Sequence, residues 1–125
     1  MKRCVVLLAL SACTTGQRVG ALAAGAMVLT ACDYRQTTAL SDGGRWDVRS
    51  PSGGHYQELN PLLGREPSPA AMAVYAAAAE ASIAAVAASR LPAWAKYAAL
   101  GLVAAAEAVE VARAAPAAGA CGGRR

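Results

Sequence analysis

The chain has 125 residues, enough for one domain at most, and 56% of them are hydrophobic while only 16% are charged. This composition is typical of a small membrane or envelope protein and argues against a soluble enzyme. The formal charge of +4 is spread thinly along the chain, without a basic patch that carries interleaved aromatic residues, which argues against nucleic-acid binding. We therefore expect no enzyme, no cofactor and no nucleic-acid partner.

The first part of the chain resembles the leader of a bacterial lipoprotein. Lys2 and Arg3 precede an apolar run that ends in L-S-A-C at Cys13, and a second apolar run ends in L-T-A-C at Cys32. Both endings resemble the lipobox, where a signal peptidase cuts before a cysteine whose sulfur then carries a diacylglycerol. We expect Cys13 to be the lipidation site, after a short signal segment at residues 1–12. Cys32 is the alternative, because a cut there gives a leader of conventional length.

Residues 13–41 are expected to form a first membrane helix if Cys13 is the processed cysteine. Gly16 and Gly20 are spaced four apart, which lets another helix approach closely. The helix also carries one polar stripe, formed by Thr30, Asp33, Gln36 and Thr37. If Cys32 is processed instead, this helix is a discarded signal.

A Gly/Ser/Pro-rich loop is expected at residues 42–68, followed by a helical hairpin at 69–116 and a flexible basic tail at 117–125. Within the loop, Asn60 and Pro61 predict the start of a short helix that Gly64 ends. Ser68-Pro69 predicts a longer helix through Arg90, and Pro92 predicts another that ends near Pro116. The expected fold is therefore all-α, an N-terminal helix plus an Ala-rich antiparallel hairpin that spans the membrane.

Two sequence blocks resemble an uncharacterised family of small bacterial and prophage membrane proteins. They are D-x-x-Q-T at residues 33–37 and E-x-N-P-L-L-G-x-x-P-S at residues 58–68. The resemblance covers residues 5–113 and implies that the first block ends the first membrane helix and the second leads into a hairpin. The chain departs from the family in its Gly-rich insert and in its Ala-rich hairpin. The resemblance implies no activity, but it favours Cys13 over Cys32, because Asp33 then belongs to the retained helix.

Four polar side chains could converge where the first helix meets the loop: Asp33, Gln36, Glu58 and Asn60. One interpretation is a cation or proton site, since ionisable groups near a membrane are costly and often functional. The other interpretation, which we favour, is that these side chains cap helix ends and hold the loop.

Glu80 and Glu107 are charges that a membrane-spanning hairpin would place within the membrane. Each would then have to be protonated, paired or turned toward water. A proton relay is one interpretation, and solvated helix faces or an interhelical pair is the other. No metal site is expected, because the chain has a single His and no C-x-x-C pair. A disulfide between Cys32 and Cys121 would require an oxidising periplasm, and the Gly/Ala-rich tail around Cys121 argues against it.

The sequence predicts a membrane-anchored protein of the bacterial envelope, in the inner membrane, with a structural or interaction role. Its expected partners are membrane lipid and either a second copy or a larger membrane protein. The alternatives are a holin-like phage protein and a periplasmic lipoprotein with a soluble hairpin. With Cys13 outside, the loop and the tail would be cytoplasmic and the turn from Arg90 to Lys96 periplasmic, in agreement with the positive-inside tendency.

Overall fold

The computed structural model describes the chain from residue 14 to residue 121 with short gaps, namely residues 14–41, 45–46, 48–49, 53–58, 60–119 and 121. The expected signal segment, the lipidation site Cys13 and the last four residues of the tail lie outside the described residues. In the part that is described, the fold is all-helical, with three helices and one isolated antiparallel bridge between Arg49 and His55. The expected fold class is confirmed at this level.

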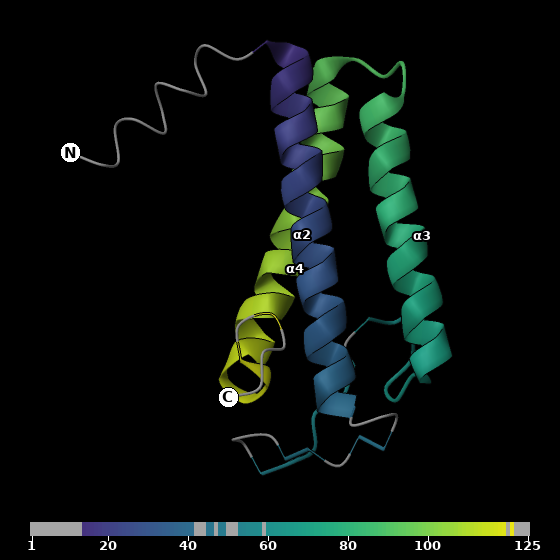
Figure 1. Ribbon diagram of the computed structural model, residues 1–125, viewed down its shortest axis with the longest axis vertical. Coiled ribbons are helices and arrows are strands. Elements are labelled where there is room, and N and C mark those ends of the chain that lie inside the picture. Colours follow the sequence, from purple (N-terminus) through teal and green to yellow (C-terminus); the bar gives the residue numbers. More distant parts are fainter. Residues whose placement is uncertain are drawn as a thin grey trace, which may run out of the picture.

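The three helices are α2 (Thr15–Ser41), α3 (Pro69–Ala88) and α4 (Ala93–Ala118). They lie side by side, with α2 and α4 running in one direction and α3 running in the opposite direction (Figure 1). The contacts between α2 and α4 are the most extensive, and those between α3 and α4 are the sparsest. The two helices of the hairpin therefore pack mainly on α2 and only weakly on each other.

The start of α3 follows from its capping residues. The Ser68 side chain accepts a hydrogen bond from the Ala71 N–H at 3.2 Å, and Pro69 occupies the first helical position. The helix ends at Ala88, two residues before the expected Arg90, because the backbone of Ser89 is extended. The Lys96 ammonium then donates to the Ala87 carbonyl at 2.8 Å, which satisfies one of the free carbonyls at this helix end.

One local prediction is wrong. The segment from Asn60 to Gly64 forms a hydrogen-bonded turn and not a short helix: the Leu63 N–H donates to the Asn60 carbonyl at 3.1 Å. A left-handed Gly64, with φ of 77°, stops the turn before a second helical bond can form. At the other end of the chain, α4 ends at Ala118, two residues beyond Pro116. A proline in the last turn removes a single N–H donor, and the loss is small where tertiary contacts hold the helix end.

The core is small because alanine supplies little apolar area. One cluster of buried residues lies between the three helices, made of Val19, Ala23, Ala26, Ile83 and Leu100. A second cluster lies where α2 and α4 end, made of Leu40, Ala114 and Ala118. Each buried alanine removes far less apolar surface from water than a leucine does, so close helix contact replaces bulk in this bundle.

Much apolar surface stays exposed. Among the described helices, only α3 is long and apolar enough to cross a membrane, and most of its surface is not covered by the other two helices. Large apolar side chains on the surface of the described residues are Val28, Leu62, Val74, Leu91, Trp94, Leu102 and Val109. Such a surface is typical of a protein that contacts lipid or another protein.

Candidate functional site

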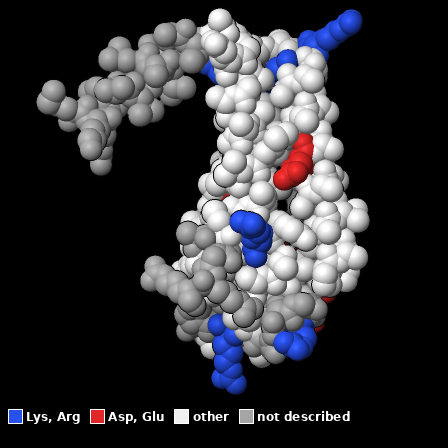
Figure 2. Space-filling model, in the orientation of Figure 1, with Lys and Arg blue, Asp and Glu red and all other residues white. Residues whose placement is uncertain are grey.

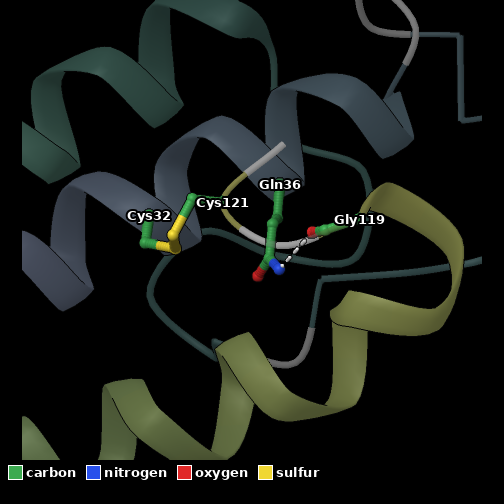
Figure 3. Close-up of a disulfide and its surroundings, with 4 residues drawn as sticks. All are labelled: Cys32, Gln36, Gly119 and Cys121. Atoms are coloured by element: carbon green, nitrogen blue, oxygen red, sulfur yellow. Dashed lines mark hydrogen bonds between the residues drawn. A yellow bond between two sulfur atoms is a disulfide. The ribbon is translucent and has the colours of Figure 1, made fainter. Parts of the chain in front are cut away.

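A disulfide joins α2 to the segment that follows α4. Cys32 and Cys121 are bonded through their sulfur atoms, with their Cα atoms 4.3 Å apart (Figure 3). The expectation that the tail around Cys121 would not support this pairing is therefore wrong. Gly119 and Cys121, which follow α4, contact α2, and this brings the two cysteines together across 89 positions of sequence. Cys32 is 3% exposed, so this alternative lipidation site lies buried in the bundle.

Gln36 lies one helical turn beyond Cys32 and points toward the end of α4 (Figure 3). Its side chain is fully buried, and its amide nitrogen donates to the Gly119 carbonyl at 2.9 Å. Gly119 adopts φ of 76°, which favours glycine, and its own N–H closes α4 on the Ala115 carbonyl at 2.9 Å. The Gln36 side-chain oxygen has no hydrogen-bond partner among the described residues. Gln36 thus fastens the end of α4 to α2.

Asp33 lies at a pocket that α2 forms with the loop and the first turns of α3. Together with Thr30 and Glu58 it lines a small cavity of about 20 Å³, roughly the space of one water molecule. Burial raises the pKa of Asp33 to about 7, and the negative charges of Glu107, Glu58 and Glu110 add to this effect. Asp33 therefore changes its charge near neutral pH.

Glu107 of α4 shares this acidic neighbourhood. Burial raises the pKa of its carboxyl group, the nearby charges of Glu110 and Glu58 raise it further, and a hydrogen bond with the Thr30 side chain opposes the shift. Glu110 is held by Arg113, whose guanidinium lies 2.8 Å from its carboxylate on the next turn. Because Arg113 also lowers the pKa of Asp33, it offsets part of the local negative charge.

The structure brings together only part of the polar cluster suggested by the sequence. Asp33 and Glu58 line the same cavity, whereas Gln36 contacts Gly119 at the end of α4. Asn60 accepts a hydrogen bond from the Leu62 N–H at 3.0 Å, which is the capping role in a turn. Glu80 of α3 is exposed.

Trp46 is a structural residue that the sequence analysis missed. It is 4% exposed, and its indole N–H donates to the Pro67 carbonyl at 3.2 Å. Its backbone N–H donates to the Ser41 carbonyl at 2.9 Å, so one residue joins the end of α2 to the segment before α3. The available signal was a large aromatic side chain within a Gly/Ser-rich loop, since exposed loop segments seldom require one.

The site can hold and release protons, but the described residues offer little further chemistry. No group of three or more His, Cys, Asp or Glu side chains in this part of the chain is arranged to hold a metal ion. Comparisons with protein-family models, with curated proteins and with solved structures gave no match. The features of the molecule that bear on its function are the disulfide, the buried polar contacts and the exposed apolar surface.

Proposed function

We propose that the protein is a lipid-anchored helical bundle on the outer side of a bacterial membrane, with a structural or interaction role. The observation that carries this proposal is the disulfide between Cys32 and Cys121. Disulfides persist in the periplasm and at the cell surface, whereas cytoplasmic thiols are kept reduced. The lipid anchor proposed at Cys13 is also attached on the outer side of the membrane.

A common side for both cysteine modifications argues against helices that cross the membrane. Cys32 follows Thr15, the start of α2, by 17 residues, or about 26 Å along a helix. A hydrocarbon layer is about 30 Å thick. If α2 crossed the membrane with Cys13 outside, Cys32 would therefore lie near the cytoplasmic face, where the disulfide would be reduced. The disulfide thus argues against the topology expected from the charges, which placed the loop and the tail in the cytoplasm.

The position of Glu80 supports the same conclusion. Glu80 lies near the middle of α3, and its side chain is exposed. If a single bundle crossed the bilayer, this carboxylate would face hydrocarbon, where a charged side chain is costly. On a bundle outside the membrane it is an ordinary solvated charge.

The exposed apolar side chains support an interaction role. Leu102 and Val109 are 73% and 65% exposed and lie two turns apart on α4. Val28 of α2 is 66% exposed. The spacing of Leu102 and Val109 puts both on one face of α4, and an apolar face on a helix surface is suited to contact with a partner. A second copy or a larger envelope protein is the kind of partner that such a surface fits.

A membrane-spanning hairpin is the second candidate, because α3 is long and apolar enough to cross a membrane. It includes the holin-like function and the architecture implied by the family resemblance. In this alternative the packed helices would cross the membrane together. The disulfide between Cys32 and Cys121 would then have to form on the outer side of the membrane, either before or after the helices insert.

Lipid labelling and extraction test the proposal. Cys13→Ser should abolish labelling by a radioactive fatty acid, whereas Cys32→Ser should leave it intact; the reverse pattern would contradict an anchor at Cys13. Cys13→Ser secreted behind a cleavable leader should be released by alkaline carbonate and should run faster on non-reducing than on reducing gels. Retention in the carbonate pellet would instead support helices that span the membrane.

A further inference from the structure

The end of the bundle where α2 begins carries only positive charge. This end consists of residues 14–20 of α2 and residues 86–97 around the connection between α3 and α4. It contains Arg18, Arg90 and Lys96 and neither Asp nor Glu, so its formal charge is +3. The visible face of this end shows basic side chains and no acidic ones (upper end in Figure 2). All described acidic residues lie farther along the helices or in the loop at the other end.

Two large apolar side chains are exposed at the same end. Trp94 is 73% exposed in the first turn of α4, and Leu91 is 49% exposed in the connection before it. Tryptophan is enriched where an apolar phase meets water, because its ring is apolar while its N–H can still form a hydrogen bond. Exposed tryptophan and leucine beside arginine are the residues that interfacial membrane contacts use.

Two hydrogen bonds connect the helix ends that carry these side chains. The Tyr97 hydroxyl donates to the Thr15 carbonyl at 3.5 Å, which joins the start of α4 to the start of α2. The Lys96 ammonium donates to the Ala87 carbonyl and so joins the start of α4 to the end of α3. A hollow of about 360 Å³ lies between these helix ends, lined in part by Gly16, Leu91 and Lys96. These contacts hold the helix ends that carry the basic and apolar groups next to one another.

We infer that this end of the bundle docks on the surface of an anionic phospholipid membrane, with Trp94 and Leu91 entering the headgroup region. Positive charge attracts anionic headgroups, and the two apolar side chains gain by leaving water. The inference rests on the proposed anchor, because Cys13 precedes α2 by two residues and would tether this end to the bilayer. Docking would orient the disulfide and the acidic groups away from the membrane.

Vesicle binding by the protein without its lipid tests this inference. The chain from residue 13 with Cys13→Ser is mixed with vesicles of phosphatidylglycerol and phosphatidylethanolamine at about 30:70, and with phosphatidylcholine vesicles. Trp94 emission should shift to shorter wavelength and be quenched by brominated lipid on the anionic vesicles alone, and Trp94→Phe should lose both signals. Trp46, which is 4% exposed, should not respond and reports that the fold is intact.

Charge variants provide the matched control. Arg90→Ala should weaken partitioning about fivefold, as expected for one basic residue near an anionic surface, and added salt should weaken it further. Arg65→Ala removes an exposed arginine from the opposite end and should leave partitioning unchanged. Equal effects of the two variants, or a Trp94 that stays insensitive to anionic vesicles, would overturn the docking surface. Loss of Cys13 labelling with intact vesicle binding would overturn the anchor and leave the docking surface standing.

Discussion

Removing the disulfide with Cys121→Ser should strongly destabilise the bundle. Cys32 and Cys121 are separated by 89 positions, so the bond closes most of the chain into one loop. In the chain-entropy treatment, a loop of this length restricts the unfolded chain by about 4–5 kcal/mol. The small Ala-rich core has little stability to spare, because domains of this size are stabilised by only about 5–15 kcal/mol in total.

A loss of about 4–5 kcal/mol also predicts a lower melting temperature. The unfolding entropy of globular proteins is about 2.1 cal/mol/K per residue, which for a chain of this length is about 0.26 kcal/mol/K. Dividing the loss by this entropy gives a decrease in Tm of about 15–20 °C. Urea unfolding followed by circular dichroism and by tryptophan emission measures the free energy directly, on the chain from residue 13 carrying Cys13→Ser, which lacks the lipid and the thiols of Cys4 and Cys13.

The reducing agent supplies the control. Reduction of the parent protein should lower its stability to that of Cys121→Ser, and reduction of the variant should change nothing further. A loss smaller than about 1 kcal/mol in both comparisons would refute the argument that loop closure supports the fold. Two reactive thiols in the unfolded, unreduced protein would show that the bond does not form, and the assignment to an oxidising compartment would then have no support.

Substitutions at three further residues test the polar groups. Because Asp33 holds its proton more tightly in the folded protein, the free energy of unfolding should fall as pH rises from about 4 to about 7. Asp33→Asn should reduce this pH dependence and add about 1–2 kcal/mol at pH 8, a figure that allows for solvent screening. Urea unfolding at several pH values measures the effect, and an unchanged pH dependence would contradict it. Gln36→Leu should lower the stability by at most about 1 kcal/mol, because it removes an unsatisfied buried oxygen along with one hydrogen bond. Gln36→Ala should lower it by about 2–4 kcal/mol, because it leaves a cavity. Equal losses of the two variants in thermal unfolding would show that the hydrogen bond dominates. Glu80→Ala should change stability by less than about 0.5 kcal/mol and leave carbonate extraction unchanged, since Glu80 is exposed; a shift into the membrane pellet would favour the spanning hairpin.

The helices could be predicted from the sequence because their signals are local. Ser68 and Pro69 act within one turn of the residues that they cap, so the start of α3 follows without knowledge of the rest of the fold. The end of α4 depends on distant contacts. Pro116 signals a stop, but Gln36 holds Gly119 from another helix, and no local pattern records that contact.

The candidate site was only partly predictable for the same reason. Helical periodicity places Asp33 and Gln36 on one polar stripe of α2, and in the structure Asp33 is half-buried and Gln36 is buried. It cannot tell which neighbour each side chain meets, because that depends on how the loop and the tail pack. Asp33 meets the carboxylates of Glu58 and Glu107, while Gln36 meets the chain after α4. Two residues of one polar stripe therefore have different roles: Asp33 is a titratable group, and Gln36 fastens the end of α4 to α2.

The disulfide between Cys32 and Cys121 changes how the distribution of Lys and Arg is interpreted. The count of Lys and Arg indicates which loops stay inside only if the helices between those loops cross the membrane. If α2 stays outside, the same residues carry no information about orientation, and Arg90 and Lys96 instead become groups that can face anionic headgroups from the outer side. The pairing of Cys32 with Cys121 favours the second case, since both cysteines must meet an oxidant. Under the proposed function, the basic residues near the start of α2 support surface attachment beside a lipid anchor, and the exposed apolar side chains of α3 and α4 are available to a protein partner.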